Sequence, residues 1–175
     1  SPVQELEALI FAWSAGLLMS ERKKVLLVSL ELLPVRLVST ADYSEQPITE
    51  LIYCIKEKLD ITSRMKVLSS YLGGLTYLAG ISNGADIPAL SKEDMQIWLS
   101  AIRAQSDYDL VIFYICSNTE AAQELIKESD KVIYCGREGL FANSLYIEWK
   151  AQMERAGINL SGECFVKLAL QQETR

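Results

Sequence analysis

The chain has 175 residues, half of them apolar, and carries a net charge of −6 at pH 7 with no histidine. This length suits one domain that buries about two thirds of the surface of its unfolded chain, and the composition argues against disorder. The absence of histidine excludes imidazole bases, Ser-His and Cys-His nucleophile pairs and most zinc sites. The acidic balance, without a dense Lys/Arg cluster, argues against direct nucleic-acid binding.

The apolar segments and the first residues of the chain indicate a cellular location. The longest of them, such as Val25–Leu30 and Leu110–Cys116, are strand-sized and far shorter than the roughly 20 residues that span a bilayer. The chain also begins without the basic, apolar and small-residue pattern of a secretory signal. We therefore expect a cytoplasmic protein with no integral membrane segment. Four widely separated cysteines form no Cys-x-x-Cys pair and predict buried, unbridged thiols: Cys54, Cys116, Cys135 and Cys164.

The first third of the chain predicts two helices around one buried strand. Apolar residues spaced three or four apart predict an amphipathic helix that runs to about Ser20. Its apolar face comprises Leu6, Leu9, Ile10, Trp13 and Leu17. Val25–Leu30 is a continuous apolar run, typical of a parallel strand covered on both faces. After a loop around residues 34–45, Pro47 suits the first turn of a second helix that reaches about Leu59.

The middle of the chain predicts short strands and a third helix. Met65–Ser70 and Leu75–Ala79 are predicted as strands on either side of a Gly-Gly turn, followed by an irregular loop over residues 82–88. Ser91 and Asp94 fit a capping box, in which a hydroxyl and a carboxylate satisfy free amides at the start of a helix. The third helix therefore begins there and continues through Ile102.

The last third alternates strands with helices. Asp109–Cys116 has the strongest strand pattern, and the three polar residues after it are predicted to cap a short helix that ends near Glu128. Lys131–Cys135 and Glu163–Leu170 are predicted strands on either side of a long helix that ends at Gly157. Because parallel neighbours need helical crossovers, we predict an α/β fold: a mostly parallel central sheet with helices on both faces.

Three segments resemble the MinD/ParA-type P-loop ATPases. Lys23–Glu31 resembles that family's strand Lys-Lys-Val-Leu-Leu-Ile-Asp-Leu-Asp, and Tyr108–Cys116 resembles its Walker B strand, Tyr-Asp-x-Ile-Ile-Ile-Asp-x-x. Glu128–Tyr134 is similar to a helix end followed by a strand, Ser-Asp-x-Val-Ile. These blocks follow one another in family order, and the resemblance covers nearly the whole chain. Gly73–Tyr77 also resembles a Gly-Gly-Leu-x-Tyr segment of the CpaE-like branch, which is linked to pilus assembly.

The resemblance implies that residues 1–175 form a single P-loop NTPase-like domain whose nucleotide site has degenerated. A phosphate loop needs Gly-x-x-x-x-Gly-Lys-Ser/Thr ahead of the first helix. The resemblance places residues 1–3 at the end of a strand and Gln4–Ile10 at the loop. It aligns Ala8 with the family's lysine and Leu9 with its magnesium-binding hydroxyl. This stretch has no glycine, and the charges of Glu5 and Glu7 would repel a triphosphate.

Further positions of the nucleotide site are also changed. Tyr114 stands where the Walker B aspartate would orient magnesium and water, and Ser29 replaces the aspartate of the earlier strand. We expect Tyr114 to fill the core or cleft space that nucleotide and metal leave. Glu31 is the one acid kept near a strand end, where a solvated or capping role suits it better than a ligand contact. The resemblance further implies a strand upstream of Ser1 and, as in CpaE-like proteins, a receiver-like domain before it.

These observations predict a pseudo-ATPase that has no catalytic residue, metal or cofactor and keeps its fold as a surface for a protein partner or for self-association. Pilus assembly and polar positioning are the settings that the resemblance implies. One alternative is an ATP-binding enzyme with nonstandard residues, which would use ATP and magnesium. Another is a receiver or flavodoxin-like module, but a receiver needs clustered aspartates at strand ends with a lysine opposite, and Ser29, Tyr114 and Cys135 do not supply them.

Overall fold

The structure of the chain is a computed structural model that describes residues 2–30, 46–81, 84–105, 107–137, 139–160 and 165–170. Helices and strands alternate over most of these ranges. In chain order the elements are α1 (Pro2–Ser20), β1 (Val25–Leu30), α2 (Pro47–Lys56), α3 (Ile61–Leu68), β2 (Ser70–Leu72), β3 (Leu75–Leu78), α4 (Lys92–Gln105), β4 (Leu110–Ile115), α5 (Glu120–Glu128), β5 (Val132–Arg137), α6 (Leu140–Arg155) and β6 (Phe165–Leu170).

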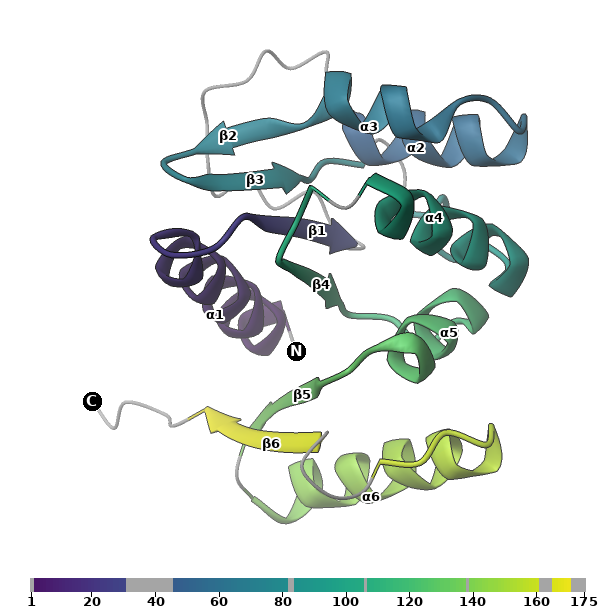
Figure 1. The fold of residues 1–175 in the computed structure, drawn as a ribbon. Helices are drawn as coiled ribbons and strands as arrows, with labels where there is room; N and C mark the ends of the chain where they lie inside the picture. Colours follow the sequence, from purple (N-terminus) through teal and green to yellow (C-terminus); the bar gives the residue numbers. More distant parts are fainter. Residues whose placement is uncertain are drawn as a thin grey trace.

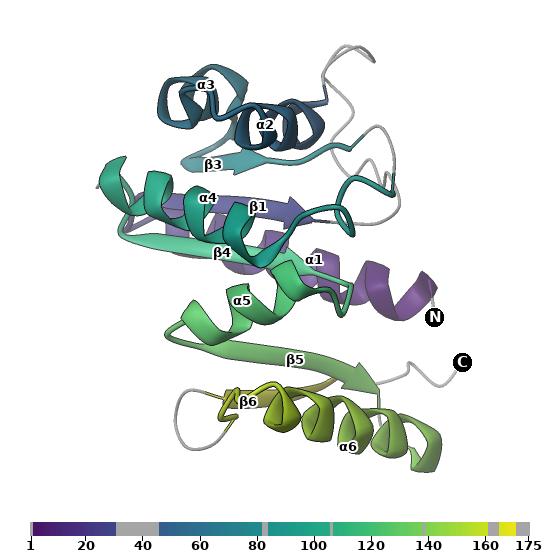
Figure 2. The same ribbon diagram turned by 90° about the vertical axis from the view of Figure 1, so that its right-hand side faces the viewer.

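The strands form two sheets. β1 pairs in parallel with both β3 and β4, and β2 adds to β3 in the antiparallel direction, which gives the order β2-β3-β1-β4. β5 and β6 pair in parallel as a second sheet, which Figure 1 shows next to β4 in the same stack of strands. α1 lies on one face of this stack, whereas α4, α5 and α6 lie on the other (Figures 1 and 2). The predicted α/β fold, with a mostly parallel sheet and helices on both faces, is confirmed.

β1 forms the centre of the core, and every one of its residues is buried. The side chains of Leu26, Val28 and Leu30 pack in the cluster that includes Trp98 of α4. Those of Val25 and Leu27 pack in a second cluster with residues of α1. This burial on both faces explains why the strand is a continuous apolar run rather than an alternating one.

The ends of several helices are fixed by the caps that the sequence predicts. At the start of α4, the Ser91 amide donates to Asp94 Oδ2 at 2.9 Å, and the Asp94 amide donates to Ser91 Oγ at 3.1 Å. At the start of α5, the Ala122 amide donates to Thr119 Oγ1 at 3.2 Å. After α6, Gly157 adopts a φ of 77°, the left-handed conformation that glycine takes up most easily.

One predicted strand is wrong in part. Met65–Leu68 belongs to α3, and β2 begins only at Ser70. The helix forms because Asp60 caps it, accepting the Ser63 amide at 3.2 Å, and because Ile61 and Met65 are buried one turn apart. The hydrogen bonds from Ser63 also lower the pKa of Asp60 below its ordinary value, as expected for a carboxylate that accepts them.

The buried face of α1 differs from the face that periodicity predicts. Leu9 and Trp13 are buried as expected, and Trp13 meets Tyr77 edge to face with 4.8 Å between ring centroids. The rest of the predicted face stays more than one third exposed: Leu6, Ile10 and Leu17. In their place the small residues Ala12 and Gly16 turn toward the sheet, so the helix presents two adjacent stripes, one buried and one uncovered.

The cysteines are present as thiols at all three described positions. Cys54 is buried in α2, whereas Cys116 and Cys135 are only partly buried. Burial raises the pKa of the Cys135 thiol above its ordinary value, which disfavours the thiolate. Burial was therefore predicted correctly for Cys54 and overestimated for the other two, and Cys164 lies outside the described residues.

Candidate functional site

The positions that the resemblance assigns to a phosphate loop lie within a helix. Pro2 and Val3 were expected at the end of a strand and Gln4–Ile10 in a loop, but all of these residues belong to α1. Local chemistry accounts for the helix, because proline suits its first turn and carboxylates near its start interact favourably with the helix dipole. The expected strand end and loop are therefore wrong for the described residues.

Four of the predicted site residues nevertheless come together. Ser29 of β1 and Tyr114 of β4 are paired neighbours in the parallel register. Tyr114 packs in the cluster that contains Leu9, with Ala8 at its edge. Ser29 points to the same face of the sheet, because it alternates with the inward-facing Leu30 and shares the side of Leu27. Glu31, the fifth predicted residue, lies outside the described residues.

The side chains of these four residues have the burial and packing of a hydrophobic core. Leu9 is 1% exposed and Tyr114 is 7% exposed, so both side chains are packed rather than lining an open site. Ser29 is completely buried, and its Oγ has no hydrogen-bond partner among the described residues. A phosphate needs cations and free amides, and magnesium needs carboxylate or hydroxyl oxygens around open space. The four side chains do not fit either group, and we derive no reaction step through them.

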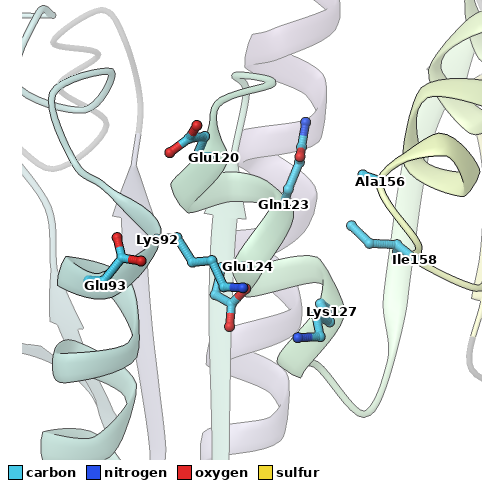
Figure 3. Close-up of a pocket in the computed structure, with 8 residues that line it drawn as sticks. All are labelled: Lys92, Glu93, Glu120, Gln123, Glu124, Lys127, Ala156 and Ile158. Carbon is cyan, nitrogen blue, oxygen red and sulfur yellow. The ribbon is translucent and has the colours of Figure 1, made fainter.

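A cavity of about 430 Å³ lies elsewhere, on the outer face between α4 and α5 and beside the turn after α6 (Figure 3). Its lining comprises Lys92, Glu93, Glu120, Gln123, Glu124, Lys127, Ala156 and Ile158. Glu124 is almost fully buried there, with Gln96 donating to it at 2.7 Å and Lys92 Nζ lying 3.7 Å away. The most buried charge of the cavity is therefore balanced within the protein. No local sequence pattern predicts this cavity, because its residues come from two helices and a turn.

A second polar network joins α2 to the start of α4. Lys56 donates to Asp94 and, at 2.8 Å, to the carbonyl oxygen of Ala89. Burial raises the pKa of Asp94, but the hydrogen bonds from Lys56 and Ser91 outweigh burial, so the pKa lies below its ordinary value. The carboxylate thus caps a helix and anchors a neighbouring one, which is a structural role.

Two further findings concern the described ranges alone. Each helix there is too short or too polar to cross a bilayer. No group of three or more Asp, Glu or Cys side chains in those ranges gathers closely enough to hold a metal ion.

No protein-family model and no curated protein sequence matches the chain. Several solved structures are similar to it. Apo McdA from Cyanothece aligns with a TM-score of 0.62 and 14% identity, over 90% of this chain and 65% of McdA. A McdA variant in complex with ATP aligns with a TM-score of 0.59 and 15% identity, over 90% of this chain and 63% of the variant.

The third similar structure is a putative plasmid partition protein from Borrelia burgdorferi B31 bound to AMPPNP. It aligns with a TM-score of 0.63 and 14% identity, over 93% of this chain and 81% of that protein. This chain thus spans less than two thirds of the length of the two McdA structures. At such low identity the likeness concerns the fold alone, and this chain shares its α/β fold with these structures.

Proposed function

We propose that this chain is a cytoplasmic, non-hydrolysing domain that keeps the MinD/ParA-type fold as a platform for protein contacts in a positioning or assembly process. The observation that carries the proposal is the course of α1 through residues 4–10, with Leu9 packed against the sheet. In an α-helix that begins at Pro2, only about the first four residues leave their amides without a helical partner. The amides of Ala8 and Leu9 are therefore used inside the helix and cannot wrap a phosphate.

The proposed loss of hydrolysis also draws support from the sheet. The buried phenol of Tyr114 and the buried hydroxyl of Ser29 occupy positions where the related fold would need ligands for magnesium. Neither group is a carboxylate, and Tyr114 packs in one cluster with Leu9 of α1. A nucleotide bound here would have to displace core side chains. Loss of the packing of one large core side chain costs about 2–5 kcal/mol of folding free energy.

The proposed role in protein contacts draws support from α6. Leu140 and Ile147 are 90% and 64% exposed. The two residues are seven positions apart, so they lie on one stripe of the helix, which is the arrangement of a helix that packs against another apolar surface. The similar structures include a plasmid partition protein and McdA, and we extend to this chain only the expectation of a positioning role shared with a partner or with a second copy.

The proposal is tested by calorimetric titration of the protein with ATP and magnesium. We expect no heat of binding up to millimolar nucleotide and no phosphate release above the rate in buffer. Micromolar binding would refute the proposal, and hydrolysis that disappears in Glu31→Gln would instead establish an ATPase with nonstandard residues. Sedimentation equilibrium tests the contact surface, where Ile147→Glu is expected to weaken self-association or partner binding. The matched control Leu145→Glu, at a 53% exposed apolar position on another side of the same helix, is not expected to weaken it.

A further inference from the structure

The outer side of α6 carries an uncharged stripe. Its members follow one another at intervals of four, three and four residues and so share one line of the helix: Leu140, Ser144, Ile147 and Ala151. Leu140 and Ile147 are 90% and 64% exposed, Ser144 is exposed and Ala151 is half-buried. Two large apolar side chains therefore alternate with two small ones. We call these four residues the α6 stripe.

The other sides of α6 make contacts inside the domain. Trp149 packs against Tyr134 of β5, with 4.8 Å between the ring centroids, which marks the side toward the sheet. Asn118, just ahead of α5, donates to Gln152 at 2.5 Å, which marks the side toward α5. Among the described elements, α6 also lies at the end of the stack of strands (Figures 1 and 2). A partner as large as a folded domain can therefore reach the α6 stripe.

The one polar side chain of the α6 stripe is suited to burial. Ser144 Oγ donates to the Leu140 carbonyl oxygen at 3.0 Å, a bond within the helix itself. Burial of a hydroxyl is costly only when it leaves the hydroxyl without a hydrogen bond. An apolar surface can therefore cover the stripe while this bond persists.

The charges of α6 favour a second copy as the partner. The whole chain carries a net charge of −6, so two copies repel each other on average. The charged residues of α6 form two pairs: Glu148 lies 2.8 Å from Arg155, and Lys150 lies 3.9 Å from Glu154. This helix therefore has no net charge, and two copies can meet along it without the repulsion that acts between the chains as a whole.

We propose that a second copy of this chain covers the α6 stripe, with the two α6 helices packed antiparallel about a two-fold axis. Most homo-oligomers are related by such an axis, which makes one surface meet itself. An axis midway between Ser144 and Ile147 places these two residues opposite each other. It also places Leu140 opposite Ala151, so each large side chain of one copy meets a small one of the other. In a parallel pair large residues would meet large ones and small would meet small, which leaves gaps.

Sedimentation equilibrium tests the second copy as the occupant. The inference rests on the proposed function, because it names the partner of the contact surface proposed there. We expect a dimer at micromolar concentration, and Ile147→Glu is expected to raise its dissociation constant at least tenfold, because it places two carboxylates in the interface. The matched control Leu145→Glu lies on another side of the helix and is expected to change it less than twofold. Far-UV circular dichroism is expected to stay unchanged in both variants, since both side chains are exposed.

Cysteine cross-linking tests the antiparallel register. Leu140→Cys and Ala151→Cys are made in separate chains, mixed and oxidised, and the wild type gives the background from the native cysteines. In the proposed dimer the two new thiols of a mixed pair face each other. Two copies of the same variant hold theirs about 16 Å apart along the helix, whereas a disulfide needs Cα atoms within about 7 Å. We expect the mixture to form a covalent dimer at least fivefold faster than either variant alone.

Each result bears on a separate part of the proposal. A monomer at sub-millimolar concentration, or a dimer that Ile147→Glu leaves intact, would overturn the pairing through α6. Either cysteine variant cross-linking alone as fast as the mixture would overturn the antiparallel register. A monomer that binds no ATP would overturn this inference and leave the proposed function standing. A dimer with these properties that binds ATP at micromolar concentration would instead support the pairing and refute the proposed loss of nucleotide binding.

Discussion

Substitution of Ser29 tests whether the degenerate site is part of the core. Its Oγ is fully buried and has no hydrogen-bond partner among the described residues. An unsatisfied buried polar group costs about 1–3 kcal/mol, so Ser29→Ala is expected to raise the free energy of unfolding by about 1 kcal/mol. Ser29→Asp, which restores the residue type of the related family, is expected to lower it by about 3–5 kcal/mol because the carboxylate has no partner.

Urea unfolding followed by circular dichroism measures both variants of Ser29. The control is Ser129→Ala, which removes a hydroxyl that donates to the Leu125 carbonyl at 2.6 Å and is expected to lower the free energy of unfolding by about 1 kcal/mol. Burial raises the pKa of a carboxyl, so the deficit of Ser29→Asp should shrink as the pH falls. If Ser29→Ala is destabilised by more than the control, the hydroxyl has a partner and the interpretation of a closed core is wrong.

Three further predictions use the same unfolding assay. Asp94→Ala is expected to lower the free energy of unfolding by about 1–2 kcal/mol at pH 7, as for other helix caps. Because the pKa of Asp94 is depressed in the folded state, this difference should vanish as the pH falls below 3.8 and through the folded pKa. A difference that stays constant with pH would contradict the capping role. Leu9→Ala should lower the free energy of unfolding by about 2–5 kcal/mol, whereas Leu18→Ala, at a 67% exposed position, should lower it by less than about 0.5 kcal/mol. Equal losses would show that α1 is packed differently. Gly74→Ala should cost about 1–3 kcal/mol, since a Cβ there would lie 2.9 Å from the Ser20 carbonyl oxygen, and an unchanged stability would refute that close approach.

The parts of the fold that could be predicted are those whose signal is local and strong. Val25–Leu30 and Leu110–Ile115 are long apolar runs, and both are parallel strands of the first sheet. The capping box of Ser91 and Asp94 fixed the start of a helix because the two groups bond to each other's amides. Met65–Leu68 was misassigned because its apolar residues suit a strand, whereas the deciding contact is the cap several residues earlier.

The candidate site was predicted only in part. That Ser29 and Tyr114 lie side by side depends on the order of the strands, which local patterns do not predict. The resemblance assigned both residues to one nucleotide site but predicted no strand order. The predicted loop at Gln4–Ile10 was wrong because it followed the family resemblance, whereas local chemistry favours a helix that begins at Pro2, a typical first residue of a helix. Periodicity also could not tell which of two adjacent stripes on α1 is buried, because that choice depends on the sheet beneath it.

The arrangement of two sheets has a consequence for how the molecule opens. β1 is held by strands on both sides and by helices on both faces, so its amides are expected to exchange only when the whole domain unfolds. β5, α6 and β6 follow one another in sequence, and β5 pairs with β6 and contacts α6. This segment is joined to the first sheet through α5 along the chain and through the contact of β5 with α1. We expect such a segment to be a separate cooperative unit that unfolds and refolds while the first sheet stays folded. Stability in this domain is therefore distributed unevenly along the stack of strands, from β1 outward.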